Sequence, residues 1–118
     1  MPFLVGANLP KQMPGACFRE LLNRSEILQI PGAHTGMASL LAKRAGFEAV
    51  YVGGSAMTGT MGIPDLGIIT VDEVCFFIRQ VARASGLPIL VDGDTGHGEA
   101  LNVMHMVRSF EEIGRAHV

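Results

Sequence analysis

Two aspartates two residues apart, Asp92 and Asp94, are the residues of this sequence with the clearest capacity for chemistry. They follow an apolar segment, residues 88–91. Side chains two apart on an extended chain point the same way, and two carboxylates held together repel unless a proton or cation intervenes. Ligand sets made only of oxygen favour a hard ion, Mg²⁺ or Mn²⁺. The pair therefore indicates either a divalent-cation site or an ordinary strand-to-helix turn, in which Asp and Gly are common.

Two more polar, glycine-rich clusters follow apolar segments in the same way. They are residues 31–34 (PGAH) and the run Gly53, Gly54, Ser55, equivalent in position to residues 92–98 (DGDTGHG). Ligands of α/β proteins bind at the carboxyl ends of parallel strands, so three such clusters predict one shared site. The glycine run either directs backbone N–H groups at an anion or simply ends a strand. Glycine spacing in residues 93–98 does not fit a dinucleotide-binding motif.

Three further residues lie near these clusters in the sequence. Tyr51 stands near the end of the second apolar segment, where its side chain either joins the core or reaches into the site. Asp65 follows a proline in a long loop, a position typical of turn formers. His97, as a lone histidine, is more typical of a hydrogen-bonded loop residue than of a catalyst. We interpret it as a variation or an error and not as a catalytic acid.

Alternating strands and helices must position these residues. Strands are predicted at 27–30, 48–52 and 88–92, and helices from Met37 to about Gly46, after a capping box at 70–73, and from Ala100 to about Ile113. A long loop is predicted to follow residue 54. The apolar stripes expected to face the core are Met37, Leu40 and Leu41; Val74, Phe77, Ile78, Val81 and Ala82; and Val103, Met104, Val107 and Phe110. This order predicts an α/β fold with a parallel sheet, either doubly wound or closed into a barrel.

The composition excludes several classes of partner. Of 118 residues, 48% are apolar and 17% charged, and the net charge is −2, so neither nucleic acid nor an anionic membrane is an expected partner. No apolar run approaches the roughly 20 residues that cross a bilayer. Cys17 and Cys75 lack metal-ligand spacing and are expected to be buried free thiols of a cytoplasmic protein.

Together, three segments resemble the isocitrate lyase and phosphoenolpyruvate mutase superfamily. They are AVYVGGS at 49–55, GIPDLG at 62–67, and VDGDTGHG at 91–98 followed by ALNV at 100–103. The resemblance runs from about Phe18 to Phe110 and is greatest to methylisocitrate lyases. It implies that residues 1–111 are the amino-terminal part, about three βα units, of an (α/β)₈ TIM-type barrel. Members of this family swap their final helix between subunits and usually form homo-tetramers.

The resemblance also implies roles for the site residues. Asp92 and Asp94 would hold Mg²⁺, or alternatively Mn²⁺, directly or through water, with Asp65 in the outer shell of the ion. The substrate carboxylate and oxygen would be bound by Gly53, Gly54 and Ser55. Tyr51 matches a tyrosine that is a candidate proton acceptor near the substrate hydroxyl.

The implied reaction is cleavage of a C–C bond in a small α-oxyacid, methylisocitrate, to pyruvate and succinate, a step of propionate metabolism. In the lyases the final proton donor is a cysteine in a K-[KR]-C-G-H lid segment, which this sequence lacks, and neither of its cysteines matches it. Oxaloacetate decarboxylases and phosphonopyruvate-type mutases share the metal motif and are alternatives. A non-enzymatic alternative is an inactive truncated fragment or a binding module.

Three departures from the family pattern weaken assignment to one activity. His97 stands where the family usually carries Tyr or Phe, Gly53-Gly54-Ser55 replaces the Ser-Gly-Gly of many lyases, and the loop to Asp65 is slightly short.

The final residues, 112–118 (EIGRAHV), are expected to be a non-native tail. In this family the last helix should lead through a glycine into an apolar strand that ends in an acidic ligand. A widely used sequencing adapter, read in one frame, encodes this same heptapeptide followed by a stop codon. We therefore expect the 118-residue chain by itself to be insoluble or molten, and inactive, because a sheet of about three parallel strands leaves an unpaired edge.

Overall fold

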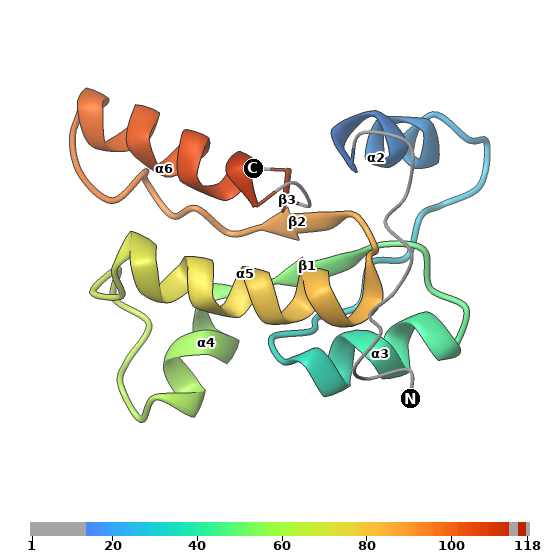
Figure 1. The fold of residues 1–118 in the computed structure, drawn as a ribbon, viewed down its shortest axis with the longest axis horizontal. Helices are drawn as coiled ribbons and strands as arrows, with labels where there is room; N and C mark the ends of the chain where they lie inside the picture. Colours follow the sequence, from blue (N-terminus) through green and yellow to red (C-terminus); the bar gives the residue numbers. More distant parts are fainter. Residues whose placement is uncertain (1–13, 114–115, 118) are drawn as a thin grey trace.

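The computed structural model describes residues 14–113 and 116–117 and shows helices packed around a small sheet (Figure 1). Its elements are α2 (Pro14–Leu22), α3 (Gly36–Arg44), β1 (Val50–Val52), α4 (Gly54–Thr60), α5 (Val71–Ser85), β2 (Ile89–Val91), α6 (Ala100–Glu112) and β3 (Ala116–His117). The α/β class predicted from the sequence is confirmed. Within the described residues, no helix has the length and apolar character needed to span a bilayer.

The sheet is parallel throughout, and its strands lie in chain order, β1-β2-β3. Tyr51 pairs with Leu90, and Val52 with Val91. On the other side of β1, Gly32 forms a parallel bridge with Tyr51, fixed by a 2.9 Å bond from the Tyr51 N–H to the Pro31 carbonyl. Neighbours in space are therefore neighbours in sequence, and the carboxyl ends of β1 and β2 lie side by side.

The predicted strand at 27–30 is wrong, because the structure assigns no strand there. Pairing with β1 begins downstream, where Tyr51 bonds to the Pro31 carbonyl and to the Ala33 N–H. Ile27 is 92% exposed. Leu28 and Ile30 instead pack against the core cluster built on α2. The apolar character of this segment thus serves packing and not a backbone ladder.

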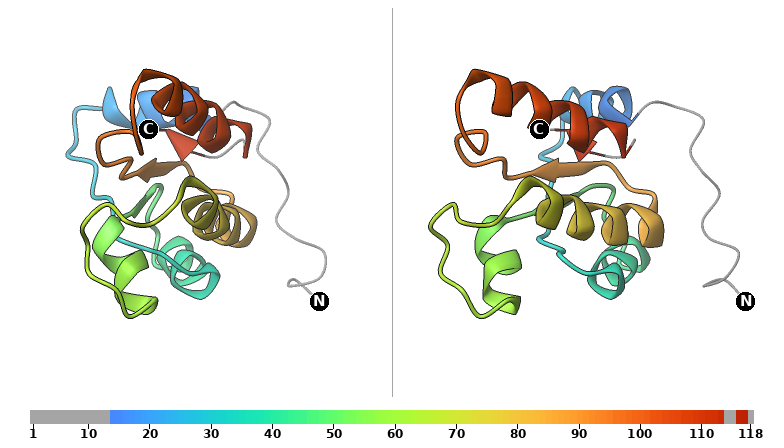
Figure 2. Two further views of the ribbon diagram at one scale, coloured as in Figure 1. Left: turned by 90° about the vertical axis from the view of Figure 1, so that its left-hand side faces the viewer. Right: turned by 60° about the vertical axis from the view of Figure 1, so that its left-hand side comes forward.

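Two clusters of buried residues cover the two faces of the strands. On one face Val50, Val52, Ile89 and Val91 join side chains from α5 and α6, including Phe110. On the other face Ala49 and Leu90 pack on α2 through Phe18 and Leu21. Figure 2 shows α5 beside α3 in both views, away from α2. Because Tyr51 is in register with Leu90, its side chain belongs to the α2 face of the sheet.

Helix α5 begins and ends as its sequence predicts. The Thr70 N–H donates to Glu73 Oε1 at 2.9 Å, and the Glu73 N–H donates to Thr70 Oγ1 at 3.2 Å, a complete capping box. Hydrogen bonds to the Glu73 carboxylate from the backbone and then the side chain of Thr70 lower the pKa of Glu73. Gly86, in the left-handed region at φ 68°, ends the helix. The predicted apolar stripe is buried along its length: Val74, Phe77, Ile78, Val81 and Ala82.

The stripes predicted for the other two helices are partly wrong. In α3, Met37 and Leu41 are 75% and 56% exposed, while the buried residue is Ser39, whose Oγ donates to the Val81 carbonyl at 3.0 Å. Small residues on this face let α3 approach α5 closely. The buried face of α3 is therefore set by close packing and is not the face with the most hydrophobic side chains. In α6, Phe110 is buried as predicted, but Met104 is 67% exposed.

We expect Thr70→Ala to lower the free energy of unfolding by about 1 kcal/mol, because it leaves an N–H of the first turn of α5 without a side-chain acceptor. Thr70→Ser, which keeps the hydroxyl, should retain most of that stability. Urea unfolding followed by circular dichroism measures both. Equal losses for the two variants would show that the cap does not stabilise α5.

Candidate active site

The carboxyl ends of β1 and β2 bring the predicted site residues together. The Asp92 N–H donates to the Val52 carbonyl at 3.0 Å, so Asp92 sits beside the residues that follow β1. Its Oδ2 accepts the Gly54 N–H at 3.3 Å. A Cβ placed on Gly54 would lie 3.0 Å from Asp65 Oδ1 and 3.2 Å from Asp92 Oδ2. Residues from a strand end, a loop and a helix start, 38 positions apart at the widest, thus converge on one point.

Helix α4 stands where the sequence predicts only a loop. It begins at Gly54 with Gly53 as its N-cap, without a side-chain capping bond, and is seven residues long. The Gly54 N–H, predicted as a donor to an anion, donates to the Asp92 carboxylate of the chain itself. Ser55 is exposed on the same first turn. Glycine, serine and threonine make up most of GSAMTGT, so the sequence gives little signal for α4.

Asp94 does not extend the strand, as its spacing from Asp92 had suggested. It lies in the left-handed region at φ 48°, and its N–H donates to Asp92 Oδ1 at 3.0 Å. The chain therefore turns immediately after Asp92, and the expectation that both side chains project from one extended segment is wrong. Aspartate tolerates this conformation better than most residues, which explains why it is found here. Asp94 is exposed, whereas Asp92 is half-buried.

Tyr51 shares the environment of all three aspartates. Its pKa is raised, first by burial, then by the charge of Asp92 and a hydrogen bond with its side chain, and then by Asp65 and Asp94. The neutral phenol is therefore favoured, and its hydroxyl donates a hydrogen bond to the Asp92 carboxylate. Gly53 accommodates the ring, since a Cβ there would lie 2.8 Å from Tyr51 Cε1. Of its two predicted positions, core or site, Tyr51 occupies the site.

The electrostatics of this cluster favour a cation. In residues 14–113 and 116–117, no Lys, Arg or His forms an ion pair with Asp65, Asp92 or Asp94, and the pair formed there joins Arg24 to Glu48. The same residues contain no group of three or more His, Cys, Asp or Glu side chains spaced to hold a metal ion. A cation here would therefore take few protein ligands and complete its shell with water, which is the habit of Mg²⁺.

Asn102, which had no predicted role, joins α6 to the loop that carries Asp92 and Asp94. Its Nδ2 donates to the His97 carbonyl at 3.1 Å, tying α6 to the loop after Asp94. Glu99 is the N-cap of α6, so Asn102 occupies the third helical position. A side-chain hydrogen-bond donor in the first turn of a helix, directly after a glycine-rich loop, is the sequence signal that could have identified Asn102.

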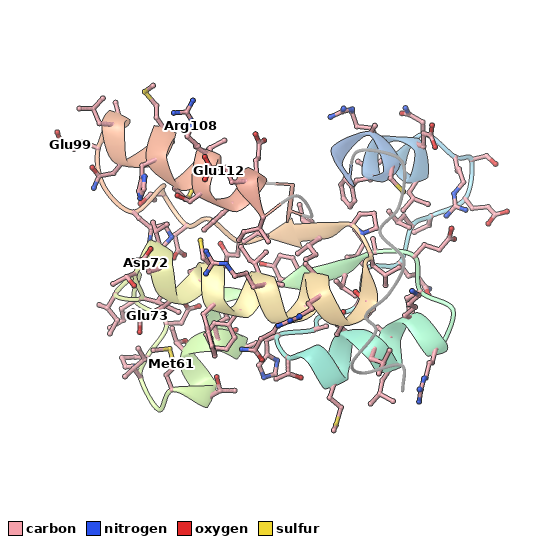
Figure 3. All side chains as sticks on the ribbon, viewed as in Figure 1. Met61, Asp72, Glu73, Glu99, Arg108 and Glu112 are labelled. Carbon is pink, nitrogen blue, oxygen red and sulfur yellow. The ribbon has the colours of Figure 1, made fainter. Side chains whose placement is uncertain are left out.

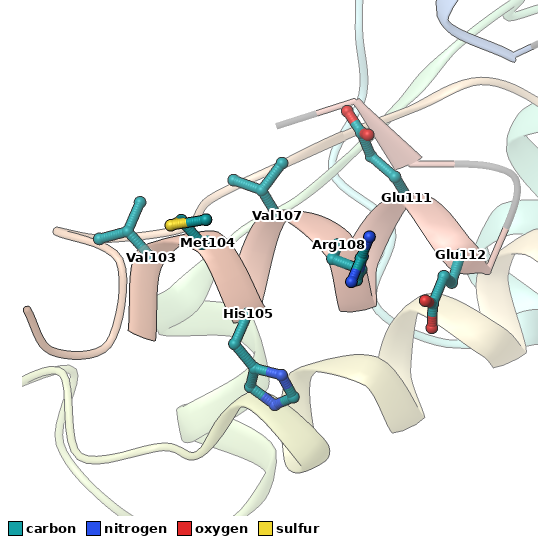
Figure 4. A pocket seen from close by; sticks show the side chains of 7 residues that line it. All are labelled: Val103, Met104, His105, Val107, Arg108, Glu111 and Glu112. Carbon is teal, nitrogen blue, oxygen red and sulfur yellow. The ribbon is translucent and has the colours of Figure 1, made fainter. Parts of the chain in front are cut away.

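Two surface hollows lie outside this cluster. One, of about 840 Å³, runs along α6 and includes Met104, Arg108 and Glu112 (Figure 4). The other, of about 330 Å³, lies between Met61 and the first turns of α5, where Figure 3 shows Met61, Asp72 and Glu73 close together. Neither is lined by a residue predicted for the site, so the carboxylate cluster remains the candidate.

Comparison with known proteins agrees with this arrangement. The sequence model of the phosphoenolpyruvate phosphomutase family matches residues 18–118. The curated 2-methylisocitrate lyase of Bacillus subtilis is 46% identical over 112 residues, which cover 95% of this chain and 37% of that protein. This chain spans about a third of the length of the curated relatives it matches.

Solved structures give the same result. Phosphoenolpyruvate phosphomutase from Streptomyces platensis subsp. rosaceus superposes with a TM-score of 0.80 at 39% identity, covering 84% of this chain and 34% of that one. A phosphonopyruvate hydrolase in complex with oxalate and Mg²⁺ superposes with a TM-score of 0.81 at 26% identity, covering 87% and 36%. The superfamily predicted from three sequence segments is confirmed: the chain belongs to the phosphoenolpyruvate phosphomutase family.

Proposed function

We propose that this chain supplies the metal-binding part of a Mg²⁺-dependent lyase that cleaves methylisocitrate to pyruvate and succinate. The observation that carries the proposal is the position of Asp65, Asp92 and Asp94 around Tyr51, with Asp65 and Asp92 also meeting at Gly54. No cationic side chain is paired to these aspartates in the described residues. Relatives named 2-methylisocitrate lyase, 44% and 46% identical, support the choice of substrate. Activity is assigned to a complete barrel and not to these 118 residues alone.

The strand order fits the barrel that the family resemblance implies. In a barrel each strand pairs with its predecessor and its successor in the chain, and all crossover helices lie outside. The bridge at Gly32, followed by β1 and β2, has that order. One half of a doubly wound sheet has the same local order, so it is membership of the family that supports the barrel over a doubly wound sheet. A homo-tetramer and a cytoplasmic location are proposed on the same family grounds.

Asp92 and Asp94 would hold the ion, and Asp65 would act from the outer shell. All three offer hard oxygen atoms, and the phosphonopyruvate hydrolase that superposes on this chain was solved with Mg²⁺. A bound Mg²⁺ supplies positive charge for the carboxylate and α-oxygen of an oxyacid substrate. Mn²⁺ has similar ligand preferences and is the practical probe.

Tyr51 would hold a proton next to the reacting oxygen. Its hydroxyl shares a hydrogen bond with Asp92, and nearby negative charge keeps that proton in place. A cation among the aspartates would offset their charge and lower the pKa of Tyr51, which would favour the acceptor role proposed for it. The backbone of Gly53 and Gly54 and the exposed Ser55 would then orient the substrate carboxylate at the edge of the cluster.

A phosphonopyruvate-type mutase is the second candidate. The solved phosphoenolpyruvate phosphomutase at 39% identity favours it, and its fold similarity covers the same part of the chain. An oxaloacetate decarboxylase remains the third, from the shared metal motif. Substrate assays separate the three, because only the lyase releases succinate.

We expect a chimaera to restore lyase activity. Residues 18–110 of this chain would replace the matching segment of the Bacillus subtilis 2-methylisocitrate lyase, to which the chain is 46% identical. With Mg²⁺ and methylisocitrate, it should form equal amounts of pyruvate and succinate. A folded tetrameric chimaera that turns over phosphonopyruvate but not methylisocitrate would instead assign the mutase activity.

Asp92→Asn should both weaken Mn²⁺ binding and lower the pKa of Tyr51. Because Tyr51 is the only tyrosine and the chain has no tryptophan, its tyrosinate absorbance is a clean probe. Folding raises the pKa of Tyr51, so its contribution to stability is present at neutral pH and is lost as pH rises through the folded-state value. Removing the Asp92 charge should move that loss to lower pH.

The matched control is Asp72→Asn, at an exposed acid of α5. An unchanged titration would place Asp92 away from Tyr51.

Gly54→Ala should weaken Mn²⁺ binding by about tenfold, equivalent to roughly 1.4 kcal/mol. Its methyl group would stand 3.0 Å and 3.2 Å from the carboxylate oxygens of Asp65 and Asp92 and force them apart. Gly59→Ala is the matched control in the same helix, where a Cβ meets nothing within 4 Å. Isothermal titration with Mn²⁺ compares the two. Equal affinities would show that the spacing of the carboxylates does not set ion binding.

A further inference from the structure

The loop that carries the aspartates folds back onto the first turns of α6. Four of its residues have positive φ: Asp94 at 48°, Gly96 at 100°, His97 at 63° and Gly98 at 145°. Residues other than glycine adopt positive φ only at a cost in conformational free energy. Such a run of residues therefore persists only where contacts with the rest of the structure hold it. Three of those contacts come from one helix.

Asn102 and Val103, on adjacent positions of α6, make the first two contacts. The Asn102 amide donates to the His97 carbonyl at 3.1 Å. Side chains at Gly96 and Gly98 would overlap Val103 and Asn102 respectively, so both glycines let the loop lie directly on the helix. Figure 4 shows Val103 on the first turns of α6, toward the end of the helix where this loop joins it.

His97 makes the third contact with its ring. The ring meets Phe110 edge to face, with centroids 6.4 Å apart and planes at 82°. Phe110 is fully buried in the core shared by β1, β2 and α5. The Nε2 atom of His97 is buried and has no hydrogen-bond partner among the described residues. A buried nitrogen without a partner is destabilising, so what this side chain contributes here is the packing of its ring.

We propose that α6 holds the loop of residues 92–99, which carries Asp92 and Asp94, in its observed conformation; we call this contact the clasp. Asn102 and His97 are then positioning residues of the carboxylate cluster. Asn102 fixes the backbone at His97, and the His97 ring anchors that point to the core through Phe110. The turn from Asp92 to Asp94 is thereby held, with the Asp94 N–H on Asp92 Oδ1. The effect on metal binding rests on the function proposed above, whereas the clasp itself does not.

The test measures loop order and metal binding separately. Asn102→Ala and Asn102→Asp both remove the amide donor, and the aspartate variant also favours the start of α6, so fraying of the helix cannot explain a shared effect. Leu101→Ala, at a residue 78% exposed, is the matched control. Amide hydrogen exchange would be followed at Asp94 and Gly96, whose N–H groups bond within the loop, with Val81 of α5 as internal reference.

Both Asn102 variants should speed exchange at Asp94 and Gly96 by about three- to tenfold, the effect of losing one hydrogen bond, and leave Val81 unchanged. Mn²⁺ affinity should fall by a similar factor in Asn102→Ala. His97→Phe keeps the ring contact and removes the buried nitrogen, so it should raise the melting temperature and preserve slow exchange, whereas His97→Ala should not.

Unchanged exchange in both Asn102 variants would overturn the clasp, as would loss of loop protection in His97→Phe. If the chimaera binds no Mn²⁺, the proposed function fails while the exchange data still decide the clasp. The same substitutions in the chimaera give the measurement where the 118-residue chain aggregates.

Discussion

Parallel pairing of β1 with β2 is the constraint on which the site depends. The Val52 carbonyl accepts the Asp92 N–H, and this hydrogen bond fixes how the carboxyl ends of the two strands lie relative to one another. One strand continues into Gly53 and Gly54, and the other ends at Asp92. A shift of β2 by one residue would turn Leu90 into the core of α5 and α6 and point Ile89 and Val91 away from it. Burial of the Val50, Val52, Ile89 and Val91 side chains on one face therefore fixes the geometry of a polar cluster on the other face of the same strands.

The cluster itself balances repulsion against hydrogen bonding. Asp92 accepts N–H groups from Gly54 and Asp94 and shares a hydrogen bond with Tyr51. These donors stabilise its negative charge, while Asp65 and Asp94 oppose it from nearby. The raised pKa of Tyr51 reflects burial first and then this negative charge. The absence of a Cβ at Gly54 is what allows Asp65 and Asp92 to approach one another across its backbone.

Local sequence signals predicted the elements that are determined locally. The capping box at Thr70 and Glu73, the stripe of α5 and its end at Gly86 follow from short-range physics and are confirmed. Elements set by tertiary contacts were predicted less well. Residues 27–30 have a strand-like composition but pack without a ladder, and α3 buries Ser39 in preference to Met37 and Leu41 because small residues let it approach α5. Helix α4, with two glycines among its seven residues, has no periodicity to detect.

The candidate site shows the same division. Grouping at the strand ends was predictable, because parallel strands share an edge, and the structure brings Tyr51, Gly54, Asp65 and Asp92 together. The turn at Asp94 was not, because it depends on backbone conformations beyond the strand. Nor was the contact of Asn102 with His97, which requires the loop to fold onto α6. Motif spacing records which residues converge, but not the contacts that hold them.

Relatives with different named activities match this chain over the same region. A 2-methylisocitrate lyase, a phosphoenolpyruvate phosphomutase and a phosphonopyruvate hydrolase share it, each over about a third of its own length. A region shared by proteins of different named activities cannot by itself distinguish their reactions. A cation held by the aspartates at the ends of β1 and β2 would suit any of these chemistries that develops negative charge on an oxyacid. The choice among them is made by groups that contact the rest of the substrate, which explains why this region identifies the family more sharply than the reaction.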